Sequence, residues 1–277
     1  SERHWGLQQD QQRHGLTSSL GSFRDIHKVL NHPPPNHTIY LNRFSPSSHW
    51  RENSNSIGAA RCIVRWLESH GCRVINGTQA LELEVSKVAQ IVACRNVGLR
   101  FPHTDIAVGN EGLRMAAQRW LQAASRHNEQ IIVKPNCGGS GHGVRIFENG
   151  RQLQEAIDNG ESLHTSPDGV LLLQHFIPSS VIHRLEFVGY ELLYAVKIRT
   201  STSFNHCPCE QQVEKDTSAS TCSMVPKFEI SSDFPSNESE WLLTQALIRM
   251  LKQHTVQVAG IEAIQDAKGC WWIIDCN

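Results

Sequence analysis

The most informative stretch of this sequence is a glycine-rich segment flanked by two β-prone runs. It reads Ile131-Ile132-Val133-Lys134-Pro135-Asn136-Cys137-Gly138-Gly139-Ser140-Gly141-His142-Gly143-Val144. Glycines have no Cβ atom, so neighbouring backbone N–H groups can approach one ligand and point at it, as phosphate oxygens require. Lys134 precedes the loop and can place a positive charge over the same oxygens. The segment therefore predicts a mobile flap over phosphates, with a merely flexible hairpin tip as the alternative.

Two common phosphate-binding motifs do not describe this segment. The sequence has no G-x-x-x-x-G-K-[ST], which excludes a P-loop, and its glycines lack the dinucleotide-binding spacing. The residues after Gly143 are Val-Arg-Ile-Phe, which is typical of a strand and not of a helix. A glycine-rich tip between two strands is the interpretation that remains.

Composition limits what the rest of the chain can be. The 277 residues are 39% hydrophobic and 19% charged, which allows two or three compact lobes. The 26 basic and 27 acidic residues give a net charge of −1, which excludes a protein that grips nucleic acid or an anionic membrane by charge. No apolar run reaches the about 18 residues of a membrane span. The sequence shows no secretory leader, and because it opens on Ser1 we expect a piece of a longer protein.

The nine cysteines are scattered without a disulfide framework, which favours free thiols in a reducing, cytoplasmic compartment. Only Cys207 and Cys209 form a tight pair, and their spacing is shorter than that of a zinc knuckle. We interpret this pair as a loop with two thiols. Recruitment of His206 and Cys222 to a metal is the less favoured alternative.

Local patterns predict the order of the elements. Strand 38–41, helix 55–70 and strand 72–75 form a βαβ unit with parallel strands. Beyond it, the predicted helices are 85–95, 112–127, 151–158 and 238–254, and the predicted strands are 105–108, 131–134, 144–147, 170–174, 184–188 and 192–199. Residues 1–36 are expected to be poorly ordered apart from a short helix at 23–30, and 206–237 read as a long loop.

The last predicted element is a hairpin, 256–264 with 270–275, that opposes two carboxylates. If residues 268–269 form a two-residue tip, Glu262 faces Asp275, and Asn277 shares that face because side chains alternate. Opposed like charges destabilise a sheet unless a cation lies between them. Carboxylate and amide oxygens are ligands that Mg²⁺ prefers. The hairpin predicts a Mg²⁺ site, with Mn²⁺ as a substitute ion; ordinary surface acids are the alternative, and a longer turn would shift the register.

Taken in order, these motifs resemble the ATP-grasp superfamily, and within it the ribosomal-protein-glutamate ligase (RimK-like) type. The resemblance runs from about residue 37 to residue 277. Its carriers are Leu41-Asn42-Arg43, Val74-Ile75-Asn76-Gly77, Ser86-Lys87, the segments 98–104 and 133–144, Leu173-Gln174-His175-Phe176-Ile177, His183-Arg184, Ala195-Val196-Lys197-Ile198-Arg199, Ala259-Gly260-Ile261-Glu262 and Ile274-Asp275-Cys276-Asn277.

The resemblance implies an α/β (α+β) fold of three lobes, in which ATP lies between two antiparallel-rich sheets and a small βαβ pre-grasp domain precedes them. We expect a poorly ordered arm over 1–36 and a partial pre-ATP-grasp domain over 37–84. A central lobe with the flap would span 85–165. A C-terminal lobe with the Mg²⁺ site would span 166–277 and contain the loop 206–237.

The resemblance also implies roles for individual residues around ATP. The residues expected to contact its phosphates through side chain or backbone are Lys87, Lys134, Gly139, Ser140, Gly141 and Gly143. The hinge strand expected to read the adenine edge comprises Gln174, His175, Phe176 and Ile177.

Further roles implied by the family concern charge and metal. Arg184 and Arg199 would stabilise the transferred phosphate or the acyl phosphate. Lys197, on the same strand face as Arg199, would help to bind ATP. The expected Mg²⁺ ligands are Glu262, Asp275 and Asn277. This sequence departs from the family pattern in two places. Position 262 holds Glu where Asp is more usual, and the gap from it to Asp275 is one residue longer than the family pattern has. The segment after 199 lacks the usual glycines, which leaves Asn205 a weak ligand candidate.

The implied activity is that of an ADP-forming, Mg²⁺-dependent ligase that joins a carboxylate to an amine through an acyl phosphate. Its substrates would be small molecules, amino acids or peptides. Two alternatives stay open, a kinase of the same fold that phosphorylates a small-molecule hydroxyl and an ATP-binding scaffold without turnover. The near-zero net charge speaks against a polyanionic kinase substrate. The sequence leaves the substrates and the oligomeric state open.

Overall fold

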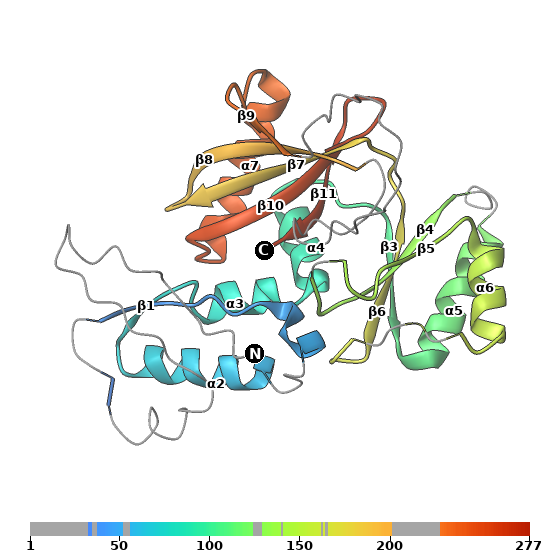
Figure 1. The fold of residues 1–277 in the computed structure, drawn as a ribbon, viewed down its shortest axis with the longest axis horizontal. Helices are drawn as coiled ribbons and strands as arrows, with labels where there is room; N and C mark the ends of the chain where they lie inside the picture. Colours follow the sequence, from blue (N-terminus) through green and yellow to red (C-terminus); the bar gives the residue numbers. More distant parts are fainter. Residues whose placement is uncertain are drawn as a thin grey trace, which may run out of the picture.

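The computed structural model describes residues 33–34, 38–51, 56–123, 129–139, 141–161, 163, 166–200 and 228–277 (Figure 1). Several predictions lie outside these residues, namely the helix at 23–30, the contact by Ser140, the ligand candidate Asn205 and the thiol loop at 207–209. The described part forms a small parallel sheet and two larger antiparallel sheets. Its mixed α/β architecture is the fold class that the sequence predicted.

The N-terminal unit is the predicted βαβ unit. Strand β1 (Ile39–Leu41) pairs in parallel with β2 (Arg73–Ile75), and η2 (Pro46–Arg51) and α2 (Ser56–Ser69) connect them. Helix α2 buries Ile57, Ala60, Val64 and Leu67 at helical spacing, which explains why the pattern was readable. Helix α3 (Thr78–Glu84) follows and was not predicted, because its seven residues are too few to show a period.

The central sheet has the strand order β3-β6-β4-β5, with every neighbouring pair antiparallel. Its strands are β3 (Thr104–Val108), β4 (Ile131–Pro135), β5 (Arg145–Phe147) and β6 (Val170–His175). Helices α5 (Gly109–Gln122) and α6 (Gly150–Asp158) cover one face (Figure 1). Trp120, Leu153 and Leu173 are fully buried between these helices and the sheet. The opposite face is left for the cavity described below.

The second sheet has the order β11-β10-β7-β8-β9 and is also antiparallel throughout. Its strands are β7 (Val181–Val188), β8 (Glu191–Arg199), β9 (Phe228–Ser231), β10 (Val258–Gln265) and β11 (Trp271–Cys276). Helices α4 (Lys87–Asn96) and α7 (Glu238–Gln253) pack on one face through a core that includes Leu185, Phe187 and Leu247. Strand β9 corrects the predicted loop 206–237, since residues 228–231 extend the edge of β8.

Two elements lie across the expected lobe boundaries. Strand β6 was placed in the C-terminal lobe, but it pairs with β3 and β4 in the central sheet. Helix α4 was placed in the central lobe, but it contacts β11 and α7. The boundaries followed chain order, whereas hydrogen-bond pairing and burial of an apolar face decide where an element belongs.

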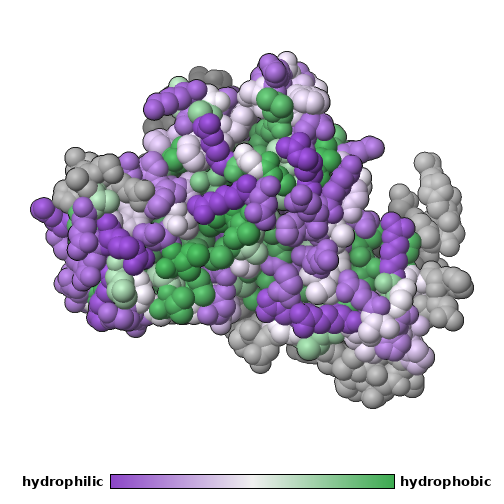
Figure 2. Space-filling model, turned by 180° about the vertical axis from the view of Figure 1, so that it is seen from behind, coloured by the Kyte–Doolittle hydropathy of each residue, from purple (hydrophilic) through white to green (hydrophobic). Residues whose placement is uncertain are grey.

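The surface seen from behind is largely hydrophilic, with patches of hydrophobic residues between (Figure 2). Large hydrophobic side chains that are exposed on the described residues include Val108, Leu193 and Ile230. Such residues are normal on folded proteins. None of the described helices has the length and apolar character needed to cross a bilayer.

Candidate functional site

A cavity of about 780 Å³ lies between the two antiparallel sheets. Residues from β4, β5 and β6 line it from one side, and residues from β7, β10 and β11 line it from the other. Gly141 of the glycine-rich loop and Asp275 of β11 therefore face the same space. The predicted site residues that line it are Lys87, Lys134, Gly139, Gly141, Gln174, His175, Phe176, Ile177, Arg184, Glu262, Asp275 and Asn277.

Of the predicted site residues that the structure describes, three do not line this cavity. In the register of β7 and β8, Arg184 pairs with Val196, whereas Lys197 pairs with His183. Opposed residues share a face, so Lys197 and Arg199 lie on the face opposite to Arg184. Arg199 is exposed and forms an ion pair with Glu229 at 3.3 Å. The structure therefore does not bring Arg199 and Lys197 to the cavity. The side-chain period of the strand showed that the two share a face, but it could not show which face of the sheet that is.

Gly143 is the third of these residues. It has a left-handed backbone with φ of 75°, as does Gly141 with φ of 70°, so both positions favour glycine. Gly141 lines the cavity and Gly143 does not. His142 and Val144 on either side of Gly143 also line the cavity, so Gly143 is the residue of this turn that does not.

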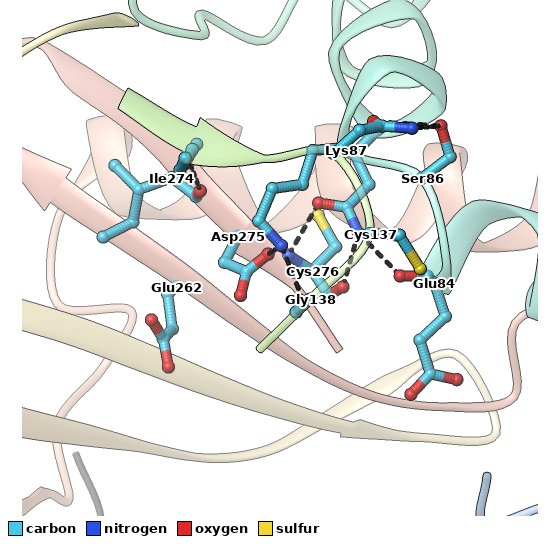
Figure 3. Close-up of polar contacts among 12 residues, drawn as sticks. Glu84, Ser86, Lys87, Cys137, Gly138, Glu262, Ile274, Asp275 and Cys276 are labelled. Carbon is cyan, nitrogen blue, oxygen red and sulfur yellow. Dashed lines mark hydrogen bonds and ion pairs between the residues drawn. The ribbon is translucent and has the colours of Figure 1, made fainter. Parts of the chain in front are cut away.

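Two lysines, Lys87 and Lys134, line the cavity, and Figure 3 shows Lys87 beside Gly138 and Asp275. The ammonium of Lys87 donates to the carbonyl oxygen of Gly138 at 3.0 Å and lies 3.3 Å from Oδ1 of Asp275. The ammonium of Lys134 donates to the carbonyl oxygen of Ile274 at 3.3 Å. Burial, with the nearby Lys87 charge, lowers the pKa of Lys134 to about 8. This end of the cavity holds positive charge that an anionic ligand would stabilise.

The predicted pair of carboxylates is present. Glu262 on β10 is directly opposite Asp275 on β11, and Asn277 continues on the same side through two backbone hydrogen bonds with Gly260. The predicted two-residue tip is wrong: the Asp266 carboxylate accepts from the amides of Lys268 and Cys270, which builds a longer turn. The longer turn shifts the register by one residue.

A β-bulge restores the register before the carboxylates are reached. Ala263 pairs with Ile273 and Glu262 pairs with Asp275, so Ile274 is the extra residue on β11. The carbonyl oxygen of Ile274 is the one that accepts from Lys134. The bulge therefore serves two purposes, since it brings the acids face to face and presents a backbone acceptor to the cavity.

The two acids differ in their surroundings. Glu262 is 7% exposed, and burial together with the Asp275 charge raises its pKa above the usual range, against the opposing effect of Arg184. Oδ1 of Asp275 is buried and accepts no hydrogen bond from the described residues, with the Lys87 ammonium as its charged neighbour. Half-buried Glu84 points away from this contact (Figure 3), and burial and Asp275 raise its pKa to about 7. The opposed carboxylates of Glu262 and Asp275 both line the cavity and offer hard oxygen atoms of the kind that bind a divalent cation.

Gln90 of α4 holds β11, the strand that carries Asp275, in place, and sequence reasoning missed it. Its Nε2 donates to the carbonyl oxygen of Cys276 at 2.8 Å, and its Oε1 accepts from the amide of Cys276 at 3.2 Å. Gln90 is fully buried, so the pair of bonds replaces a strand neighbour at the edge of the sheet. A polar residue at a buried helix position, one turn after Lys87, was the available signal.

The other end of the cavity is the predicted hinge. The side chain of Gln174 is buried and donates to Oγ1 of Thr104 at 2.8 Å. The amides of His175 and Phe176 donate to the carbonyl oxygens of His103 and Gln130. The amide of the next residue, 177, has no acceptor among the described residues. The hinge therefore offers one free backbone donor beside a buried amide.

Several other residues that line the cavity were not predicted as site residues. They are Pro102, Gln130, Ile132, Val144, Ile146, Glu148, Ser179, Ile182, Thr200 and Ile264. Gln130 donates to the Glu148 carboxylate at 2.9 Å, which places a hydrogen-bonded pair at the rim. Ile132 was within reach of sequence reasoning, because side chains two residues apart on a strand share a face with Lys134.

Comparison with known proteins gives no match at the level of sequence: no protein-family model and no curated protein sequence matches this chain. Solved structures do resemble it. A RimK domain ATP-grasp protein from Sphaerobacter thermophilus has a TM-score of 0.57 at 14% identity, over 87% of this chain and 73% of its own. The D-cycloserine synthetase DcsG has a TM-score of 0.55 at 13% identity, over 83% and 72%.

A third similar structure is the ATP-grasp ligase PsnB, solved with a variant of its minimal precursor, Mg and ADP. Its TM-score is 0.50 at 16% identity, over 83% of this chain and 62% of its own. Identities this low establish a shared fold and nothing finer. The fold of this chain is the ATP-grasp fold.

Proposed function

We propose that this chain is an ATP- and Mg²⁺-dependent ligase that joins a carboxylate to an amine through an acyl phosphate and releases ADP and phosphate. One observation carries the proposal. The glycine-rich loop, two lysines and the Glu262–Asp275 pair, which are far apart in the sequence, line one cavity between two sheets. The ATP-grasp fold supports the same reading.

The adenine of ATP would occupy the hinge end of the cavity. Apolar side chains from both sheets, including Ile132 and Ile264, line the space and suit a flat aromatic ring. The free amide of Ile177 would donate to a ring nitrogen. The triphosphate would then extend toward the lysine pair, where Lys87 and Lys134 supply positive charge and the loop backbone supplies N–H donors.

The residues that would hold Mg²⁺ are Glu262, Asp275 and Asn277. They fit the ion, because all three line the cavity, their donor atoms are hard oxygens, and Oδ1 of Asp275 is buried without a hydrogen bond from the described residues. When bound, the metal would neutralise charge on the phosphate oxygens. Mn²⁺ would bind to the same ligands.

The reaction would proceed in two steps. An oxygen of the substrate carboxylate attacks the γ-phosphorus of ATP, the bond from that phosphorus to the bridging oxygen breaks, and ADP leaves with the electron pair. The amine nitrogen then attacks the acyl carbon, phosphate leaves with the carbon–oxygen electron pair, and the nitrogen gives up one proton. Arg184 lines the cavity and would stabilise negative charge in both steps.

The substrates would be small molecules, amino acids or peptides. The similar structures include a D-cycloserine synthetase and a ligase bound to a precursor variant, so proteins of this fold accept both sizes of substrate. All cysteines of the described part are free, which supports work in a reducing compartment such as the cytoplasm.

The test is to incubate the protein with ATP, Mg²⁺ and panels of amino acids and peptides, and to measure ADP release and products by mass spectrometry. Hydroxylamine added to the same reaction should trap the acyl phosphate as a hydroxamate. Asp275→Asn is the matched inactive control. A phosphorylated alcohol without hydroxamate would favour the kinase. ATP binding without turnover on any panel would favour the scaffold.

A further inference from the structure

Asn136 is a buried junction that the proposed function does not use. It directly follows β4 and is 5% exposed. Its Oδ1 accepts from the backbone amide of Val88 at 2.9 Å, and its Nδ2 donates to Oδ2 of Asp168 at 2.6 Å. The hydroxyl of Ser86 lies within hydrogen-bond distance of both ends of this amide. Every polar atom of the side chain is therefore engaged.

The backbone of Asn136 is engaged as well. Its carbonyl oxygen accepts from the amide of Lys87 at 3.2 Å, and its amide donates to the carbonyl oxygen of Val170 at 3.0 Å. One residue therefore ties together three segments: the start of α4, the root of the glycine-rich loop and the turn that enters β6. These segments carry, in that order, a phosphate lysine, the flap and the hinge.

Asp168 is held in a fixed position before it meets Asn136. Its Oδ1 accepts from the amide of Val170 at 3.1 Å, and the turn around it is closed by a bond from the Gly169 amide to the Ser166 carbonyl. Because Asp168 only accepts, it orients the side-chain amide of Asn136 so that the carbonyl end faces α4. An inverted amide would place an NH₂ group against the Val88 N–H.

The start of α4 matters because Lys87 is its first residue. Ser86 caps the helix by accepting from the amide of Ala89, and Asn136 supplies a second acceptor at the amide of Val88. With its backbone fixed on both sides, the Lys87 side chain reaches the Gly138 carbonyl and the Asp275 carboxylate. A shift of this helix start would carry the ammonium away from both.

We propose that Asn136, oriented by Asp168, is the positioning residue for Lys87. It locks the first turn of α4 to the root of the glycine-rich loop and so fixes the lysine ammonium at the phosphate end of the cavity. The inference rests on the proposed function for its consequence, nucleotide binding. Its geometric content, the fixed position of Lys87, is testable without any nucleotide.

The first experiment measures Lys87 in the free protein. Brief acetylation followed by mass spectrometry gives the labelling rate of Lys87 relative to exposed Lys252. We expect Asn136→Ala to raise this ratio by about tenfold, since the ammonium loses its fixed partners. Asn237→Ala is the matched control, because the side chain of Asn237 also accepts from an amide in the first turn of a helix, α7, and does not line the cavity. An unchanged ratio in a folded Asn136→Ala protein would overturn the proposal.

The second experiment couples the two residues. Binding of methylanthraniloyl-ADP with Mg²⁺ is measured for Asn136→Ala, Lys87→Met and the double variant. We expect each single change to weaken binding by about tenfold and the double variant to be no weaker than Lys87→Met, since Asn136 acts through that lysine. Additive losses would refute the positioning role. A wild-type protein that binds no nucleotide would instead refute the proposed function. The labelling experiment would then still decide whether Asn136 positions Lys87.

A third experiment exchanges the residues at positions 136 and 168, so that the proposal stays testable if Asn136→Ala fails to fold. Asn136→Asp alone places two carboxylates in contact and should destabilise the protein. Adding Asp168→Asn reverses the donor and acceptor while keeping the shape, and the residue at 136 can still accept from Val88. We expect the double swap to recover both folding and the slow labelling of Lys87. A double swap that folds but leaves Lys87 fast to label would contradict the proposal.

Discussion

The guanidinium of Arg184 lies against the backbone of Gly260, with Nη1 3.1 Å from the carboxylate of Glu262. Glu186 holds the other edge of the same guanidinium through Nε. A Cβ at position 260 would collide with this group. The glycine on β10 is therefore what allows an arginine from β7 to reach a carboxylate two residues further along β10.

Substitution of Gly260 should displace the guanidinium of Arg184 and leave the fold intact. Because the colliding atoms belong to the end of a flexible side chain, we expect Gly260→Ala to fold with a melting temperature within a few degrees of wild type. Product formation should fall about 100-fold, as in Arg184→Met, because the displaced guanidinium no longer stabilises developing charge. The double variant should be no slower than either single one, and additive losses would contradict this account.

Arg199 offers a matched comparison to Arg184, since both are arginines on neighbouring strands of one sheet. Arg199→Met should leave product formation and nucleotide affinity within twofold of wild type, because the side chain faces away from the cavity and forms an exposed ion pair. The measurement is the rate of ADP release under the conditions used for Arg184→Met. Equal losses in the two variants would show that Arg199 takes part in the reaction after all.

The stability of the metal-free protein should fall as the pH rises. The pKa of Glu84 is raised from 4.5 to about 7, so between these values the folded protein keeps a proton that the unfolded chain has lost. The free energy of unfolding therefore decreases with pH across this range, and raised Glu262 adds to the same slope. Urea unfolding at pH 5 and pH 8 measures it. Glu84→Gln should flatten the slope and stabilise the protein at pH 8 by on the order of 1–2 kcal/mol; an unchanged slope would count against the raised pKa.

Nucleotide affinity should weaken above about pH 8, where Lys134 loses its proton in the free protein. The charged form is present below that pH, and a bound phosphate stabilises it further. Fluorescence titration with methylanthraniloyl-ADP from pH 7 to pH 9.5 should show the loss. Lys134→Arg keeps its charge throughout and should remove the dependence above pH 8. A parallel decline in this variant would point to a different titrating group.

Substitution of Asp275 should lower the affinity for the metal ion more than it lowers the stability of the protein. Asp275→Asn removes one charge from the acidic pair, so Mn²⁺ affinity in the presence of ADP should fall at least about tenfold by electron paramagnetic resonance. The unbound variant should be as stable as wild type or more so at pH 8, because the repulsion with Glu262 is relieved. Asn277→Ala tests the amide ligand in the same titration. Unchanged Mn²⁺ affinity in both variants would place the metal elsewhere.

Most elements were readable from the sequence because their periods are local. Helices such as α2 and α7 show apolar positions at helical spacing, and the strands alternate or are apolar throughout. The elements that were missed are α3, β9 and η2, with seven, four and six residues, and they carry too few positions to show a period. Their place is set by the surfaces they pack on, which no short window contains.

The sequence predicted which kinds of residue form the site, but not the face of the sheet on which each of them lies. The residue types themselves, glycines, lysines and paired acids, indicate the chemistry that they can support. The structure places them around one cavity. Whether Arg199 or Arg184 faces that cavity depends on the register between β7 and β8, and a one-residue difference exchanges the faces. Hydrogen bonds across long separations, such as those of Asn136 with Val88 and Asp168, were equally invisible.

The last hairpin shows most clearly which features follow from the sequence alone and which depend on the tertiary structure. Alternation along the chain gave Asp275 and Asn277 a common face, but the pairing of Glu262 with Asp275 rested on an assumed two-residue tip and came out right because a longer turn and a bulge offset each other. The turn that Asp266 builds and the bulge at Ile274 that compensates for it came only from the folded structure. Side-chain period is a property of each strand alone, whereas register is a property of two strands and of every contact that holds them together.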